Sequence, residues 1–287
     1  TYGQNGNNAV IIIQNVDFTL TDCKGTGTIT HQEGVSGEGV YNEGRFFMYN
    51  GIISGNNGGV KNPGMFFMYG GRITSNHADN GGGVCNDAGI FTMYGGTITS
   101  NTANNGGGVY NDNAGRFIMY GGTITGNKAE QTYGTEYGGG VYNQGTFNMY
   151  GGEITNNTAT VGGGGVFNKG TFTMSGGEIT SNSSESYGGG VCYSSSQLFK
   201  MSGTVNITEN KVGTTPNNLY LWNGQQVSAS GLTSGAEIGV TTQIVPINDS
   251  SVPITSDSVS VNCFSSDKSD YETAIDENSK VVLKKKT

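Results

Sequence analysis

One short repeat dominates the sequence and recurs along most of the chain. In residues 106–127 it reads GGGVYNDNAGRFIMYGGTITGN, and the valine near its start recurs at intervals of 20, 24, 25, 32, 25 and 25 residues. Periods of this size are typical of solenoids, propellers and arrays, in which each unit buries its apolar face only against its neighbours. The chain therefore contains seven mutually dependent repeats, anchored on Val40, Val60, Val84, Val109, Val141, Val166 and Val191.

Within each repeat the apolar residues follow the period of a β-strand. One residue separates Phe117 from Met119, and Ile124 belongs to a further short strand. The Gly-Gly pair and the Gly-Gly-Gly run supply residues that can adopt φ > 0 where the chain turns. We therefore predict an all-β fold, a right-handed parallel β-helix of about ten coils with three short strands per coil and terminal caps. Its handedness follows from the general rule for parallel connections.

Equivalent residues of successive repeats form ladders, and the apolar ladders should fill a narrow core. The polar ladders consist of asparagine, whose amide can accept from one coil and donate to the next, so we interpret them as scaffold. The apolar ladders are Phe46, Phe66, Phe91, Phe117, Phe147, Phe172 and Phe199; Met48, Met68, Met93, Met119, Met149, Met174 and Met201; and Ile53, Ile73, Ile98, Ile124, Ile154, Ile179 and Ile207. The asparagine ladders are Asn56, Asn76, Asn101, Asn127, Asn157, Asn182 and Asn210; and Asn42, Asn62, Asn86, Asn111, Asn143 and Asn168.

The chain divides into three parts of one elongated domain. Residues 1–30 should form an N-terminal cap and first coil, with polar residues 1–8 across the open end, because an uncovered solenoid end exposes a strand edge. Residues 31–211 hold the seven repeats, with residues 128–137 as a longer surface loop. Residues 212–287 should form C-terminal coils and a strand-built cap, in which lysines of the last strand protect an edge.

Composition excludes several classes of partner. The net charge is −8, so the chain lacks the basic stripe that nucleic acid or an anionic membrane requires. No run of 18 apolar residues exists, so we expect no membrane insertion. The four cysteines have no metal-ligand spacing, and we expect no metal, no cofactor and a monomer.

The repeat GGGVYNxGxFxMYGGxITxN resembles that of repeat-rich right-handed β-helix proteins on bacterial surfaces, over residues 16–211. More distantly it is similar to the polymorphic outer-membrane adhesins and to autotransporter passengers, although their Phe-x-x-Asn motif is matched only by residues 47–50. The resemblance implies a member of the pectin-lyase-like superfamily that is secreted or attached to the bacterial cell surface.

Polysaccharide lyases and hydrolases share this fold, so an enzyme is an alternative. A hydrolase needs two carboxylates that converge on one bond, and a lyase needs acidic calcium ligands and a base. The repeated strands offer only Glu153 and Glu178, which we interpret as solvated surface acids, and His31 and His77 lie in different coils. We therefore predict no catalytic residues and no enzymatic activity.

Outward-pointing tyrosines are the candidate binding residues. One ladder follows the inward methionines and a second follows the inward valines, and both are predicted to be exposed. Rows of exposed aromatic rings can bind sugars or a partner protein, so we expect an adhesin or binding scaffold for glycans or a host surface protein. The alternatives are a non-binding spacer, in which stacking only stabilises the sheet, and ice binding by the outward threonines. The binding candidates are Tyr69, Tyr94, Tyr120 and Tyr150 in the first ladder, beside Tyr49, and Tyr110 and Tyr142 in the second, beside Tyr41.

Overall fold

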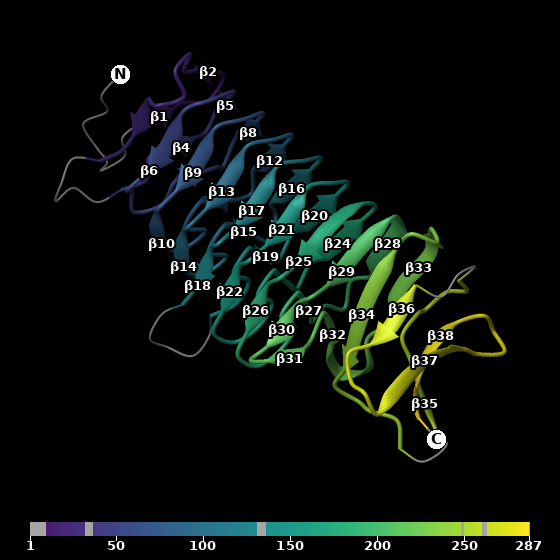
Figure 1. Cartoon of the computed structure of the whole chain (residues 1–287). Helices are drawn as coiled ribbons and strands as arrows, with labels where there is room; N and C mark the ends of the chain where they lie inside the picture. Colours follow the sequence, from purple (N-terminus) through teal and green to yellow (C-terminus); the bar gives the residue numbers. More distant parts are fainter. Residues whose placement is uncertain (1–9, 32–36, 131–135, 248–249, 260–262, 287) are drawn as a thin grey trace.

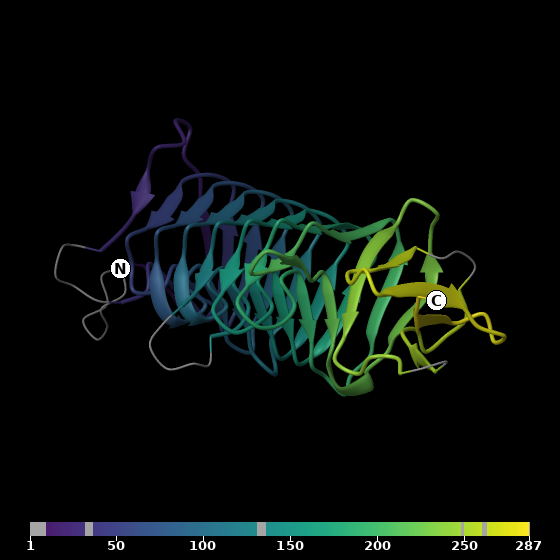
Figure 2. The same cartoon turned by 60° about the horizontal axis from the view of Figure 1, so that its bottom comes forward.

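The computed structural model describes residues 10–31, 37–130, 136–247, 250–259 and 263–286. Successive coils stack into an elongated parallel β-helix, with a strand-built cap at the C-terminal end (Figures 1 and 2). The predicted all-β solenoid is therefore confirmed. The stack that carries the phenylalanine ladder has nine strands, one fewer than the ten coils expected. The capping segment proposed for residues 1–8 lies outside the described residues.

Three stacks of parallel strands form the wall of the solenoid, as predicted. The first two are named here for the residues they turn inward. The Val stack contains β1 (Val10–Ile12), β4 (Val40–Asn42), β7 (Val60–Lys61), β11 (Val84–Asn86), β15 (Val109–Asn111), β19 (Val141–Asn143), β23 (Val166–Asn168), β27 (Val191–Tyr193) and β32 (Leu219–Leu221). The Phe stack contains β2 (Asp17–Leu20), β5 (Arg45–Met48), β8 (Met65–Met68), β12 (Ile90–Met93), β16 (Arg116–Met119), β20 (Thr146–Met149), β24 (Thr171–Met174), β28 (Phe199–Gly203) and β33 (Val227–Leu232).

The third stack, the Ile stack, merges with the Val stack near the C-terminal end. There the long strand β34 pairs with both β29 and β32, which joins the two stacks into one sheet of 19 strands. The Ile stack contains β3 (Thr28–Ile29), β6 (Ile52–Ser54), β9 (Arg72–Thr74), β13 (Thr97–Thr99), β17 (Thr123–Thr125), β21 (Glu153–Thr155), β25 (Gly177–Thr180), β29 (Val205–Thr208), β34 (Glu237–Thr242) and β36 (Phe264–Ser266).

A fourth stack, here the outer stack, was not predicted. It starts only in the coil anchored on Val60, the second repeat, and is closed at its C-terminal end by the antiparallel strand β31. Its short polar strands lack the apolar alternation that marks the other three stacks. They are β10 (His77–Asn80), β14 (Thr102–Asn105), β18 (Lys128–Ala129), β22 (Thr158–Ala159), β26 (Ser183–Ser184), β30 (Lys211–Val212) and β31 (Thr215–Pro216).

The predicted apolar ladders fill the interior. Their valine, phenylalanine, methionine and isoleucine side chains are at most 3% exposed. From Phe46 to Phe199 the rings stack with centroids 4.4–4.9 Å apart. Each buried side chain of this size contributes about 1.5–3 kcal/mol, so every coil adds an equal layer of core.

The Gly-Gly-Gly runs allow the outer stack to lie against the Val stack. In the run at residues 106–108 only Gly106 has a positive φ, of 63°. A Cβ at Gly107 would lie 2.3 Å from the carbonyl oxygen of Lys128 in β18, and one at Gly108 would lie 2.6 Å from the carbonyl oxygen of Gly140 in the next coil. Turning alone therefore explains only the first glycine. Close approach of two backbones requires the other two.

Both asparagine ladders form, so their predicted scaffold role is confirmed. Along the ladder from Asn56, each Nδ2 donates to Oδ1 of the next asparagine at 2.9–3.0 Å, and the series continues from Asn210 to Asn218. Along the ladder from Asn42 to Asn168 the same bonds measure 2.6–2.8 Å. These amides satisfy backbone groups that the turns would otherwise leave buried and unpaired.

The C-terminal cap is a three-stranded antiparallel sheet of β35 (Ser251–Pro253), β37 (Tyr271–Ile275) and β38 (Val281–Lys285). Because β38 lies between the other two, its lysines do not protect an edge, and that prediction is wrong. One short 3-10 helix, η1 (Trp222–Gly224), precedes the cap. The predicted loop at residues 128–137 is shorter than expected, since Lys128 belongs to β18 and Tyr137 pairs with Asn105 and Gly162; residues 131–135 lie outside the described part.

Candidate functional site

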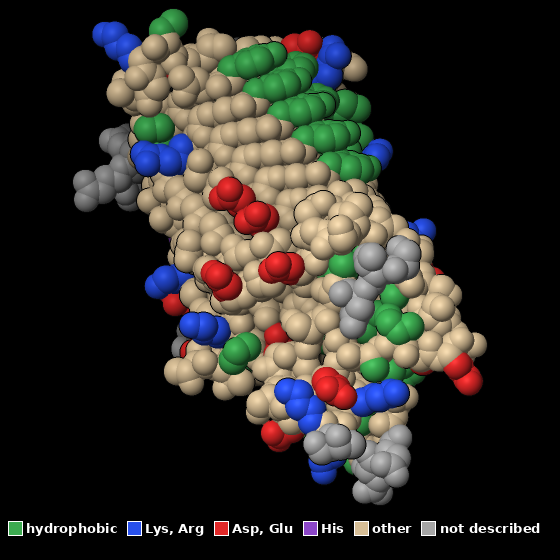
Figure 3. All heavy atoms as spheres, turned by 45° about the vertical axis from the view of Figure 1, so that its right-hand side comes forward, with side chains coloured by type: hydrophobic (Ala, Val, Ile, Leu, Met, Phe, Trp, Pro, Cys, Tyr) green, Lys and Arg blue, Asp and Glu red, His purple; other side chains and the backbone are tan. Residues whose placement is uncertain are grey.

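The tyrosines that follow the inward methionines form one continuous exposed ladder, here the tyrosine ladder. Each lies directly after a strand of the Phe stack and is 40–50% exposed. Neighbouring ring centroids are 4.7–5.2 Å apart and the planes are within 15° of parallel. Figure 3 shows a row of stacked green side chains along this face. The tyrosine ladder comprises Tyr49, Tyr69, Tyr94, Tyr120 and Tyr150, and it ends where Ser175 and Ser202 take the same position.

Stacking decides which part of each ring is available. Tyr94, for example, lies between Tyr69 and Tyr120, so both of its faces are covered by neighbouring rings. The ladder therefore presents ring edges and hydroxyl groups to solvent. Aromatic faces in a sugar-binding mode are open only at the two ends, Tyr49 and Tyr150. A partner along the middle of the ladder would meet polar, edge-on contacts.

A strip of bare backbone borders the tyrosine ladder. The Gly-Gly pair that follows each tyrosine from Tyr69 to Tyr150 has no room for side chains, since a Cβ at Gly95 would lie 2.6 Å from the carbonyl oxygen of Tyr69. Tyr49 is followed by Asn50 and Gly51 instead. Beyond this strip runs the first outward position of the Ile stack, here the mixed row. It comprises Thr28, Ile52, Arg72, Thr97, Thr123, Glu153, Glu178, Asn206 and Glu237. The ladder, strip and mixed row together form a smooth track along the solenoid.

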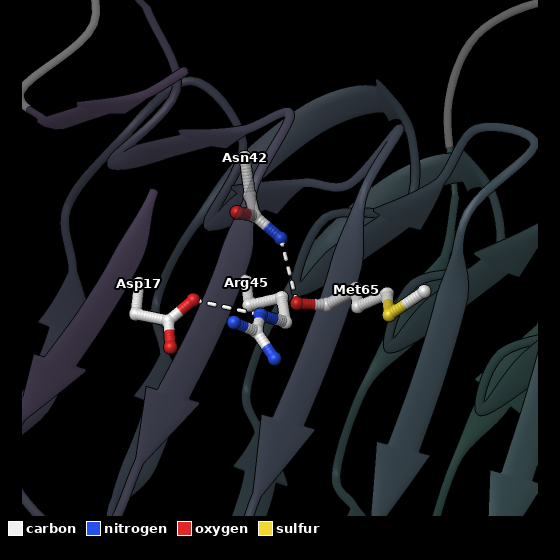
Figure 4. A network of polar contacts seen from close by, with 4 residues as sticks. All are labelled: Asp17, Asn42, Arg45 and Met65. Atoms are coloured by element: carbon white, nitrogen blue, oxygen red, sulfur yellow. Dashed lines mark hydrogen bonds and ion pairs between the residues drawn. The ribbon is translucent and has the colours of Figure 1, made fainter. Parts of the chain in front are cut away.

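The other side of the tyrosine ladder is apolar near the N-terminal end. Phe47 and Phe67 stack with centroids 5.1 Å apart on the outer face of the Phe stack, and Met65 is 42% exposed beside them. Nearby, Arg45 donates from Nε to Oδ1 of Asp17 at 2.7 Å, an ion pair that bridges β2 and β5 (Figure 4). A hollow of about 530 Å³ lies here, open between Arg45, Met65 and Ile90.

The second predicted ladder is mostly buried. Tyr142 is 5% exposed, within an apolar cluster that also contains Phe167, Cys192 and Tyr220 and is covered by side chains such as Tyr187. The prediction that both tyrosines of this ladder are exposed is therefore wrong for Tyr142. The error arises because the covering side chains lie outside the repeated strands: Tyr187 is in an isolated bridge after β26, and Trp222 begins η1.

Tyr110, at the same position one coil earlier, is half-buried. Its hydroxyl donates to Oε1 of Gln144 at 2.9 Å. Burial, with the neighbouring Tyr142, raises the pKa of Tyr110 to about 12. Both tyrosines belong to the aromatic cluster on the outer face of the Val stack, and both hydroxyl groups form a hydrogen bond with Gln144.

A second hollow, of about 440 Å³, lies where the outer stack begins. It is open between Lys61, His77, Asp79 and Cys85. Burial raises the pKa of Cys85 to about 11, so its thiol is protonated at neutral pH. The described residues contain no group of three acidic, histidine or cysteine side chains able to hold a metal ion. The other histidine, His31, bonds to Asn56 instead, with its Nδ1 2.8 Å from Oδ1.

The two outward acids lie where the sequence predicted. Glu153 and Glu178 are register partners on β21 and β25, and both side chains are exposed. Neither belongs to an ion pair, and the three ion pairs among the described residues all lie elsewhere. They form a local negative patch on the mixed row.

Comparison with protein-family models, curated proteins and solved structures found no match. In the described part of the chain, no helix has the length and apolar character needed to cross a membrane. The fold thus defines the class, a parallel β-solenoid with asparagine ladders, and any function must be inferred from its surface.

Proposed function

We propose that this chain is an exported, non-catalytic scaffold on a bacterial surface that binds an extended glycan along the tyrosine ladder. The observation that carries the proposal is the row of five stacked tyrosines, 40–50% exposed, in five consecutive coils. The repeat's resemblance to that of β-helix proteins of the pectin-lyase-like superfamily on bacterial surfaces supports the assignment to an exported surface protein.

The geometry of the track suits a linear polymer. Hydroxyl groups recur once per coil, and the distance between the two linkage oxygens of a pyranose ring is close to the coil spacing. A glycan lying along the bare strip can therefore repeat one polar contact at each coil. Each contact is weak, but linked contacts add, so avidity replaces a deep pocket. An extended host protein is the alternative occupant of the same track.

The proposal is tested by measuring binding of the chain to immobilised linear glycans of increasing length. A panel of immobilised host surface proteins is measured in parallel. We expect the affinity of the wild type to rise with glycan length until the glycan is as long as the ladder. In the double variant Tyr94→Ser/Tyr120→Ser, we expect affinity to be independent of glycan length. Serine is the native residue at the equivalent position just beyond the end of the ladder, Ser175, so the variant should fold. The matched control is Thr171→Ala/Thr173→Ala on β24, beyond the end of the ladder.

Two results would contradict the proposal. If the ladder variant and the control bind equally well, the tyrosines are not the binding surface. If the wild type binds no glycan and no protein, the chain is better described as a spacer. Release of reducing ends or unsaturated uronates from a glycan, abolished by Glu153→Gln, would instead favour the enzyme alternative.

A further inference from the structure

We propose that the track formed by the tyrosine ladder, the bare strip and the mixed row pairs with the same face of a second copy of this chain, in antiparallel orientation. The inference goes beyond glycan binding and stands on a different observation, the order of charges along the mixed row. It replaces the sequence-based expectation of a monomer, which no observation above tests.

Charge on the mixed row is arranged for self-complementarity. Reading from the N-terminal end, six consecutive positions of the row are Ile52, Arg72, Thr97, Thr123, Glu153 and Glu178, one per coil. Thr28 precedes them, and Asn206 and Glu237 follow them. A two-fold axis parallel to the strands, between the third and fourth positions, places the second opposite the fifth. Arg72 of each copy then faces Glu153 of the other, and Thr97 faces Thr123. Two identical ion pairs form, as an isologous interface requires.

Within one copy these charges remain uncompensated. Arg72 is exposed and belongs to none of the three ion pairs found among the described residues, in contrast to Arg45, which pairs with Asp17 in the Phe stack. Glu153 and Glu178 are register partners, and like charges directly opposite each other on neighbouring strands are destabilising. An arginine from a second copy would relieve that repulsion. Arg is the cation suited to this contact, because its planar fork matches a carboxylate.

The remainder of the face is compatible with the same axis. Tyr94 is placed opposite Tyr120, and Tyr69 opposite Tyr150, so four of the five exposed rings acquire an aromatic partner. The bare strip carries no side chains, which allows the two surfaces to approach closely. The aromatic rings would lie at the centre of the interface and the charged pairs at its side. Protein interfaces commonly have this arrangement of an aromatic core and a polar rim.

Sedimentation equilibrium on the full chain, at low and high ionic strength, tests the pairing. We expect a reversible monomer–dimer equilibrium that weakens with salt. R72E and E153R should each weaken dimerisation by at least about tenfold, because like charges then face each other twice. The double variant R72E/E153R should return to within about twofold of the wild type, since both pairs are restored with reversed polarity.

Two controls fix the alignment and the surface. R116E changes an exposed arginine outside the mixed row and should leave the dimer unchanged. R72E/E178R places its new arginine opposite Ile52 in the proposed alignment, so it should not restore the dimer. Circular dichroism and thermal melting of each variant establish that it is folded.

Three outcomes would overturn the inference: a wild type that stays monomeric at its highest soluble concentration, failure of R72E/E153R to recover, or recovery in R72E/E178R instead. These three outcomes concern dimerisation only, and the proposal of glycan binding would stand. Conversely, R72E should bind any glycan ligand at least as well as the wild type, because its ladder is intact and its face is no longer occupied. Loss of glycan binding in the wild type would leave the dimer prediction in place.

Discussion

The side-chain amide of Asn218 donates to Oδ1 of Asp267 at 2.6 Å, and the backbone N–H of Asn218 donates to Oδ2 at 2.8 Å. This pair ends the asparagine ladder that begins at Asn56, where Nδ1 of His31 lies 2.8 Å from the first Oδ1. All amides of the ladder point the same way, so the ladder has one donor end and one acceptor end. A carboxylate, which only accepts, occupies the donor end.

Replacing Asp267 should therefore destabilise the C-terminal coils. In Asp267→Asn, an amide nitrogen replaces one of the two acceptor oxygens that Asn218 and Thr241 use. We expect a loss of about 1–3 kcal/mol at pH 7, the usual cost of an unsatisfied buried donor. Denaturant unfolding of the variant measures it. Glu272→Gln, an exposed change in the cap, is the control and should stay near the wild-type value.

The same carboxyl group predicts a pH dependence. Partial burial raises the pKa of Asp267 above its usual value, although hydrogen bonds from Asn218 and Thr241 oppose this shift. The folded state then binds more protons than the unfolded state between the two pKa values, so stability should fall as pH rises from about 4 through the folded pKa. Unfolding measured from pH 4 to 7 should show the advantage of the wild type over Asp267→Asn narrowing with rising pH. A widening gap would show that hydrogen bonding outweighs burial.

A ladder asparagine in the middle coils should be far less replaceable than one on the surface. Asn127 is fully buried, accepts from the backbone and side chain of Asn101, and donates to Asn157 and to the carbonyl of Ile98. Asn127→Ala leaves several of these groups unpaired, at about 1–3 kcal/mol each. We expect a loss of at least about 3 kcal/mol or failure to fold. Asn148→Ala, on the outer face of β20, is the control, and equal losses in both would contradict the scaffold role.

The middle glycine of each Gly-Gly-Gly run should resist even alanine. A Cβ at Gly107 would lie 2.3 Å from the carbonyl oxygen of Lys128, so β18 must move away from the Val stack. Overpacking of this kind costs typically about 1–3 kcal/mol. Gly235→Ala is the control, since its Cβ would meet only the side chain of Thr204, at ordinary contact distances of 3.4 and 3.9 Å. Comparable melting temperatures for the two variants would mean that the outer stack can move away from the Val stack with little loss of stability.

The core could be predicted from the sequence because its evidence is periodic. Phe117, Met119 and Ile124 show the strand period, and their counterparts recur in every coil, so both the inward positions and the register between coils follow from the spacing alone. The asparagine ladders were predictable for the same reason. Only Asn218, eight residues after Asn210, falls outside the repeat and was missed as a ladder member.

The sequence could not predict which outward-pointing side chains are buried by neighbouring segments. Tyr94 and Tyr142 look equivalent in the sequence, since each follows an inward residue on a strand. Tyr94 is 45% exposed and Tyr142 is 5% exposed, because side chains from segments that follow the outer strands, such as Tyr187 after β26, cover only the second. The outer strands are two to four residues long and polar, and their pairing depends on contacts between coils that no local pattern records.

The last prediction separates a ladder that binds from a ladder that only stabilises. Tyr94 stacks on Tyr69 at 4.8 Å and on Tyr120 at 5.2 Å, and cross-strand aromatic pairs contribute roughly 0.2–1 kcal/mol each. Tyr94→Ser should therefore lower the free energy of unfolding by no more than about 2 kcal/mol. Phe117→Ala, which empties a fully buried position between Phe91 and Phe147, should lower it by about 3–5 kcal/mol. Denaturant unfolding of the two variants makes the comparison. If Tyr94→Ser proves as damaging as Phe117→Ala, the exposed rings belong to the structural framework, and the spacer alternative gains over the binding scaffold.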